Sequence, residues 1–333
     1  MSNQRFLAPA LLALLLISGV SLAIGPVALN PANLFEFSSA DAAVFWQLRL
    51  PRVALAALCG ALLALTGAAT QTLFRNPLAD PSLIGVSAGA ALATVSFVVL
   101  GAGVLASTPL MAAVGLPLAS FSGGVLATLL VLRMASRYRG ISMTALLLIG
   151  LAINAIAGAV IGGLKYVADE RALRDASFWL MGRFTDANWW QVGLLAVVLL
   201  VTLVMLQQSA EKLNLWLLGA EQAQLLGVDI NATRWLLILC ASVGVGVVVA
   251  FAGLIGFVGL MVPHLVRIWG GPDNRRLLPQ SALVGAVLMV LADALSRYLI
   301  SPSELPVGIL TALAGGPFFL LIIHLRYTEA GHA

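Results

Sequence analysis

The chain has 333 residues, of which 61% are hydrophobic and 10% are charged, and its mean hydropathy is +1.02. Because so few polar residues cannot cover a water-exposed surface, the composition excludes a soluble globule and predicts an all-α polytopic membrane protein. The formal net charge of +4 comes from basic residues in short loops between apolar segments, so we expect no nucleic-acid partner.

Apolar segments of spanning length follow one another along the whole chain, and we expect about ten transmembrane helices in one permease domain, residues 1–333. The candidates are Phe6 to Ile24, Val53 to Leu73, Leu83 to Leu100, Met111 to Met134, Met143 to Leu164, Val192 to Leu206, Trp235 to Phe251, Leu254 to Ile268, Leu278 to Leu295 and Val307 to Leu325. The first is too long for the core of a signal peptide. The eighth contains Gly256, Gly259 and Pro263, which predicts a short or broken helix.

The placement of lysine and arginine predicts the orientation of these helices. With the N-terminus inside, about eleven basic residues face the cytoplasm and about seven face outward. Both chain ends are then expected in the cytoplasm.

A semi-polar segment, Leu213 to Val228, interrupts this apolar pattern. It is too polar to cross the hydrocarbon and too rich in leucine for an ordinary loop. Gly219 is expected to separate two short helices, and Gly227 to end the second. The segment predicts either a compact knob for a cytoplasmic partner or an amphipathic helix resting on lipid.

Residues that carry out covalent chemistry are not apparent. The sequence has no GxxxxGK[ST], HExxH or CxxC motif, so we expect no catalytic residue, no metal site and no ATP hydrolysis by this chain itself. His264 is interpreted as a structural hydrogen-bonding residue rather than a ligand. Asp293 lies one helical turn before Arg297, which predicts a local ion pair rather than a proton relay.

Two regions are expected at the outer surface. Arg49 and Arg52 flank Pro51 before the second span, and Arg297 joins them; three outward-facing guanidinium groups suit the carboxylates of a docking partner, with interfacial anchoring as the alternative. The loop from Lys165 to Trp190 is charged and tryptophan-rich, which indicates a short external helix at the membrane interface.

Several long motifs, in order, resemble those of the FecCD-type permease subunits of ABC importers for iron chelates, haem and cobalamin. The motifs are FWQLRLPR from Phe45, TLFRNPLADPSLIGVSAGAALA from Thr72, LNLWLLGAEQAQLLGV from Leu213, GLIGFVGLMVPHLVR from Gly253 and LPQSALVGAVLMVLADALSR from Leu278. The resemblance covers essentially the whole chain. It implies a type II ABC importer permease fold in a bacterial inner membrane, paired as a homodimer.

The resemblance also implies the partners. Two cytoplasmic ATPase subunits, which bind ATP and Mg, would hold the coupling helices, and a periplasmic binding protein would dock on Arg49, Arg52 and Arg297. The coupling residues are Leu213, Asn214, Leu217, Leu218, Gly219, Ala220, Glu221, Gln224, Leu225 and Gly227. Ser142, Met143 and Thr144 match the region of the cytoplasmic gate.

The substrate expected from the resemblance is haem. The segment from Leu151 to Gly182 looks most like haem-type permeases, around Asn154 and in YVADERALRD. Cobalamin permeases share the pattern of Leu173-Arg174 followed by an aromatic-Trp pair, and cobalamin and ferric siderophores remain alternatives. From another class, an ion-coupled secondary transporter would need a buried titratable relay.

Overall fold

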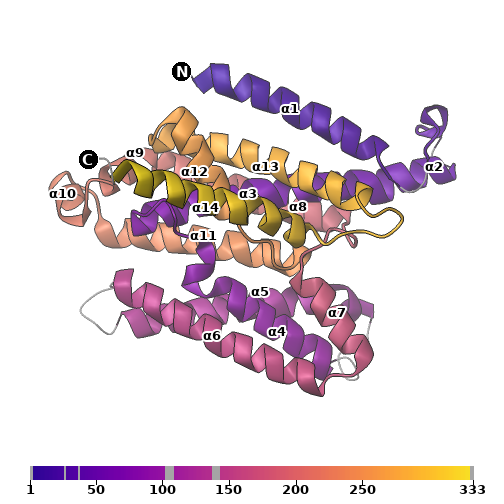
Figure 1. Ribbon diagram of the computed structural model, residues 1–333, viewed down its shortest axis with the longest axis horizontal. Helices are drawn as coiled ribbons and strands as arrows, with labels where there is room; N and C mark the ends of the chain where they lie inside the picture. The colour runs from indigo at the N-terminus through magenta and orange to yellow at the C-terminus, as the bar shows by residue number, and fades with distance from the viewer. Residues whose placement is uncertain (1–2, 26–27, 37, 102–108, 137–142, 331–333) are drawn as a thin grey trace.

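The computed structural model describes residues 3–25, 28–36, 38–101, 109–136 and 143–330, and every regular element in these ranges is helical (Figure 1). The predicted all-α membrane fold is therefore confirmed. Each of the ten predicted spans corresponds to one helix: α1 (Asn3–Ala23), α3 (Leu50–Phe74), α4 (Val86–Gly101), α5 (Pro109–Ala135), α6 (Met143–Val167), α8 (Trp189–Gln208), α11 (Ile230–Ala252), α12 (Val258–Gly270), α13 (Asn274–Tyr298) and α14 (Val307–Ala330). Among the described residues, six of the helices reach full spanning length, and α1, α4, α12 and α14 contribute shorter apolar stretches.

Helix α3 lies at the centre of the bundle and packs against α13, α11, α12 and α8. Glycines allow the closest of these contacts. A Cβ atom on Gly60 would overlap the carbonyl oxygen of Gly285 in α13, and one on Gly67 would overlap that of Gly259 in α12. The backbones therefore touch, which only residues without a side chain permit.

A second group of helices, α4, α5 and α6, packs together below α11 in the view of Figure 1. Helix α11 joins this group to α3, since it contacts α3 on one side and both α4 and α5 on the other. The bundle thus consists of two helix groups that share α11.

The two ends of the bundle differ in their short elements. The start of α1, the end of α14 and the helices α9 (Ala210–Trp216) and α10 (Ala220–Leu225) lie at one end, whereas α2 (Ala40–Ala43) and α7 (Glu170–Leu180) lie at the other (Figure 1). Helix α7 is the short helix predicted between Lys165 and Trp190, and it begins where the Asp169 side chain accepts a hydrogen bond from the Ala172 N–H (2.7 Å). The second span is longer than predicted, because α2 and the π-helical η2 (Val44–Arg49) continue into α3 without a break.

Helix α12 is short, as predicted, because α11 ends at Ala252, capped by Gly253, and the chain becomes helical again only at Val258. Phe257 takes a left-handed conformation (φ 67°) where α12 begins. The Gln71 side chain in α3 donates a hydrogen bond to the Leu260 carbonyl (3.0 Å), which satisfies one polar group near this break.

A cavity of about 390 Å³ lies between α11, the segment around η3 (Pro81–Ile84) and the break before α12. The η3 segment lines it with Asp80, Ser82 and Ser87, and the break lines it with residues 254–257. Residues 83–86 and 254–257 share the sequence Leu-Ile-Gly followed by an apolar residue, so one copy of this short repeat lines the cavity and the other lies between two of its lining residues.

Candidate coupling site and arginine cluster

Helices α9 and α10 form the knob that the sequence predicted, defined here as residues 210–228. Gly219 separates them with φ 121°, and Gly227 follows α10 with φ 85°. Both values lie in the region that favours glycine, so the two glycines fix the angle between the helices and the end of the second.

The inner face of the knob is attached to the ends of α3 and α13. Leu213, Trp216 and Ala223 are buried, and the Trp216 indole N–H points at the Leu73 carbonyl at 3.4 Å. Asn214 is half-buried and joins the knob to the start of α13: its Nδ2 donates to Asp273 Oδ1 (2.7 Å).

The same amide completes a small polar network. Asn214 Oδ1 accepts hydrogen bonds from the backbone N–H (2.8 Å) and Nδ2 (2.9 Å) of Asn274. The hydrogen bond from Asn214, more than any other contact, holds the pKa of the Asp273 carboxyl below its ordinary value. Asp273 also accepts from the Arg275 N–H as the N-cap of α13, so a single carboxylate starts a helix and anchors the knob.

The outer face of the knob is apolar and uncovered in this chain. Leu225 is 88% exposed, Leu218 60% and Leu226 58%. The other predicted coupling residues are arranged around them: Leu217 and Ala220 are half-buried, Gly219 is buried, and Glu221, Gln224 and Gly227 are exposed. Large apolar side chains on a rigidly held, semi-polar surface are typical of a protein-docking site.

The predicted outer arginines do lie together, at the end of the bundle opposite the knob, but two of them do not face outward. Arg49 Nη1 donates to the Leu22 carbonyl (2.7 Å), and Arg297 donates to the Ile24 carbonyl (2.7 Å) and the Ser21 hydroxyl (2.6 Å). The last carbonyls of α1 have no partners within their own helix, so cationic donors are favoured there. The expectation of outward-facing guanidinium groups was therefore wrong for Arg49 and Arg297.

Arg52 lies at the centre of an ion-pair network. Its Nε donates to Asp293 Oδ1 and its Nη1 to Glu304 Oε1, each at 2.9 Å. Asp293 is fully buried and also pairs with Arg297 at 3.2 Å, which confirms the predicted ion pair within α13. Arg52 and Glu304 border an open cavity of about 290 Å³ that also includes Arg183, so Arg52 is the predicted docking residue that an outer partner can approach.

The sequence did not identify Asp273, Asn274 and Glu304 as members of these sites. Asp273 has the features of a helix N-cap, since it follows a Gly-Pro pair and precedes an apolar segment. This pattern locates the start of a helix, but it does not indicate that Asp273 pairs with Asn214. Glu304 lies in the connection between α13 and α14, and nothing in its sequence context indicates Arg52 as its partner.

The expected gate residues lie at the start of α6. Met143 is half-buried and Thr144 is exposed, while Ser142 lies outside the described residues. His264 in α12 is buried and lies edge-on to Phe318 of α14, with ring centroids 6.3 Å apart.

The sequence and the fold were compared with known proteins. Residues 11–325 match the FecCD transport family. The hemin transport system permease protein HmuU of Yersinia pestis is 40% identical over 333 residues, covering 99% of this chain and 98% of that protein. The cobalamin import system permease protein BtuC of Halobacterium salinarum is 42% identical over 283 residues, covering 85% of this chain and 74% of that protein.

A solved structure shows the same fold. The chain superposes on an inward-facing ABC transporter described as of metal-chelate type with a TM-score of 0.86 and 34% identity, covering 96% of this chain and 99% of that one. Together with the ten helices and the knob, these matches identify a permease subunit of an ABC importer in the inner membrane: the chain belongs to the FecCD transport family.

Proposed function

We propose that this chain is the permease subunit of an importer that moves haem from the periplasm to the cytoplasm by ATP-driven alternating access. The observation that supports haem most directly is the hemin permease of Yersinia pestis, which aligns with 99% of this chain. The resemblance of segment 151–182 to haem-type permeases points the same way.

Cobalamin is the second candidate substrate. The cobalamin permease of Halobacterium salinarum is as similar in sequence, although it covers 85% of this chain. Ferric siderophores are a third, less favoured class. The ion-coupled alternative has no support, because the buried carboxylate that it would use, Asp293, is held between Arg52 and Arg297.

We further propose that the knob is the seat of a cytoplasmic ATPase, one per permease subunit. Leu218 and Leu225 would enter an apolar groove of that partner, and the network of Asn214 and Asp273 would transfer its movement to α13. ATP and Mg bind the ATPase, so no cofactor is assigned to this subunit. The start of α1 and the end of α14 lie at the knob end of the bundle (Figure 1), so a cytoplasmic knob would also mean cytoplasmic chain ends.

Substitutions on the outer face of the knob test this coupling. We expect Leu218→Asp and Leu225→Asp to fold normally, because both side chains are exposed, and to lose either the ATPase on co-purification or the link between ATP hydrolysis and uptake. Leu225→Met, which keeps the apolar contact, is the matched control. Normal coupled uptake in both Asp variants would contradict the assignment.

A second copy of the chain is proposed to pack on α6. This helix is the least buried of the long spans, and Cβ atoms on Gly158, Gly162 and Gly163 would meet nothing within 4 Å. Gly158 and Gly162 have the spacing of the GxxxG motif, which lets two helices approach closely. A homodimer with its pathway between the copies follows from such a contact.

At the outer end we propose that Arg52 receives a carboxylate of the periplasmic binding protein. The carboxylate would replace Glu304 on the Arg52 guanidinium. Arg49 and Arg297 would contribute their positive charge from beneath the surface, because their donors are already used by α1. Arg52→Lys keeps a positive charge beside the buried Asp293 but loses the planar guanidinium, so it is expected to weaken docking in a direct binding measurement, and unchanged affinity would remove the proposal.

A further inference from the structure

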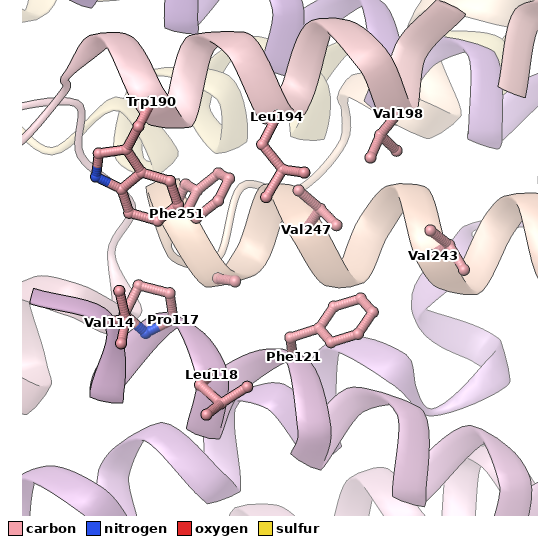
Figure 2. Close-up of a pocket in the computed structure, with 11 residues that line it drawn as sticks. Val114, Pro117, Leu118, Phe121, Trp190, Leu194, Val198, Val243, Val247 and Phe251 are labelled. Atoms are coloured by element: carbon pink, nitrogen blue, oxygen red, sulfur yellow. The ribbon is translucent and has the colours of Figure 1, made fainter. Parts of the chain in front are cut away.

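An apolar groove runs between α5, α8 and α11 (Figure 2). Its volume is about 370 Å³. Helix α8 contributes Trp190, Leu194 and Val198, each four residues after the last, and α11 contributes Val243 and Val247 at the same interval. This spacing places each set on one helix face, so the groove is built from continuous stripes along two helices.

The groove is suited to a hydrocarbon rather than to water or a polar ligand. Apart from the Trp190 indole N–H, its lining side chains carry no polar group. A cavity without polar partners does not hold ordered water, and an apolar cavity of about 150 Å³ already accommodates benzene. The groove has room for a considerably longer hydrocarbon segment.

The groove opens on a surface that has the character of a bilayer-facing one. Its mouth is defined here by its two most exposed lining residues, Leu118 of α5 and Leu194 of α8, which are 58% and 45% exposed. The neighbouring outward face of α8 continues with exposed Val197, Leu200 and Val201 and carries no charge. All three wall helices have the length and composition of membrane spans, so acyl chains are the molecules that border this opening.

One end of the groove is formed by two aromatic residues. Trp190 and Phe251 meet edge-to-face with ring centroids 5.2 Å apart, and Trp190 is the second residue of α8, at the end of the bundle opposite the knob. Tryptophan at this position is typical of a membrane interface. The groove therefore runs from the outer interface toward the bilayer interior.

We propose that this groove is a binding site for one acyl chain of an outer-leaflet phospholipid. The chain lies along Leu194 and Val247 and fills the space between the two helix groups that share α11. A second copy of the protein is a less suitable occupant, because it is proposed to pack on the open glycine face of α6, and α6 packs mainly on α4 and, of the three groove walls, mainly on α5.

Photolabelling in a bilayer tests the site. The full chain is placed in nanodiscs of phosphatidylethanolamine and phosphatidylglycerol that contain a phosphatidylethanolamine with a diazirine on its acyl chain, then irradiated and mapped by peptide mass spectrometry. We expect label to concentrate on Leu118, Leu194 and Val247, above the level on the more exposed Val197. When detergent washing precedes irradiation, the groove label is expected to persist, whereas the label on Val197 is expected to be lost.

Two variants and a control make the result specific. Val247→Phe fills the floor and Leu194→Trp covers the mouth, and we expect each to lower lipid retention about tenfold, or about 1.4 kcal/mol. Val197→Trp adds the same bulk on the outward face of α8 and is expected to leave the groove label unchanged. If Val247→Phe does not fold, Leu194→Trp at the exposed mouth provides the test.

Three results would overturn the proposal. Label spread evenly along α8 would show that only bulk lipid contacts this helix and that the groove holds no specific acyl chain. Unchanged groove label in Leu194→Trp would show that the acyl chain lies elsewhere. Capture of a second copy of the protein by a photo-crosslinker at Leu118 would show that the groove is a protein interface.

Discussion

Arg52 stabilises a carboxylate that has no access to water. Asp293 is fully buried, and its two oxygens face Arg52 and Arg297. Removing one partner of a buried ion pair leaves a charge without compensation and typically costs about 3 to 5 kcal/mol. The same guanidinium also pairs with Glu304, whose side chain is 34% exposed and whose pairing with Arg52 contributes far less.

The first prediction compares these two partners of Arg52. We expect Arg52→Ala to lower the free energy of unfolding of the purified protein by about 3 kcal/mol, and Glu304→Gln to lower it by at most about 1 kcal/mol. The thermal unfolding midpoint should therefore fall much further in Arg52→Ala than in Glu304→Gln. Differential scanning fluorimetry of both variants in one detergent measures the difference. Equal effects of the two substitutions would show that the buried pair with Asp293 stabilises the protein no more than the exposed pair with Glu304.

The second prediction concerns the pH dependence of the knob attachment. The lowered pKa of Asp273 means that its contribution to stability is complete above its ordinary value of 3.8 and is lost as the pH falls through the lower folded-state value. Asn214→Ala removes the hydrogen bond that is the largest single cause of the lowered pKa, at a cost of about 1 kcal/mol at neutral pH. The difference in unfolding midpoint from the wild type is expected to shrink below about pH 4.

A neutral hydrogen bond in the same region is the control for that experiment. Gln207 Nε2 donates to the Arg275 carbonyl at 3.0 Å, and neither group titrates in this range. Gln207→Ala should therefore differ from the wild type by the same amount at every pH. A difference for Asn214→Ala that stays constant with pH would contradict the role of Asp273.

The sequence predicted which residues are charged at the outer end but not where their side chains point. Arg49 and Arg297 donate to carbonyls and a hydroxyl of residues 21–24, which lie more than twenty residues from either arginine in the chain. No local pattern shows which helix end lies beside which arginine. The ion pair of Asp293 with Arg297 was predictable, because both residues lie on one helix, one turn apart.

Helix contacts in this bundle depend on glycines at the crossing points of α3. The third prediction is that Gly60→Ala destabilises the protein by about 1 to 3 kcal/mol, because its Cβ would overlap the Gly285 carbonyl oxygen and the helices must separate. Gly193→Ala in α8 is the matched control, since a Cβ there would meet nothing within 4 Å. The unfolding midpoint of Gly193→Ala is expected to stay the same or rise. A similar loss in both variants would mean that the close contact between Gly60 and Gly285 is not the cause of the destabilisation.

The helices themselves were largely predictable, because hydropathy over a spanning length is a strong signal. All ten spans, the short α12 and the two helices of the knob lie where the sequence placed them. The early start of the second helix at α2 was not predicted, since Asp41 and Arg49 make that part too polar to count as a span. The association of segments 80–87 and 254–260 around one cavity depends on tertiary packing, which a four-residue repeat does not specify.

Helices α3 and α13 connect the two ends of the molecule. Helix α3 carries Arg52 at its outer end and Leu73, the contact of the knob, at the other. Helix α13 begins at Asn274, beside the knob, and holds Asp293 near its outer end. These two helices are closely packed through Gly60 and Gly285, and in the proposed function this contact would transmit a displacement of the knob to the arginine cluster.

The central claim, that this permease transports haem, is tested most directly by an uptake measurement. The permease is reconstituted in liposomes with its ATPase and binding protein, and ATP-dependent uptake of haem is measured beside cobalamin and a ferric siderophore, with Leu218→Asp as the uncoupled reference. We predict that haem accumulates only with ATP and only in the coupled protein, and that it exceeds both competitors. Accumulation of cobalamin or the siderophore instead of haem, or no ATP-dependent uptake at all, would contradict this account.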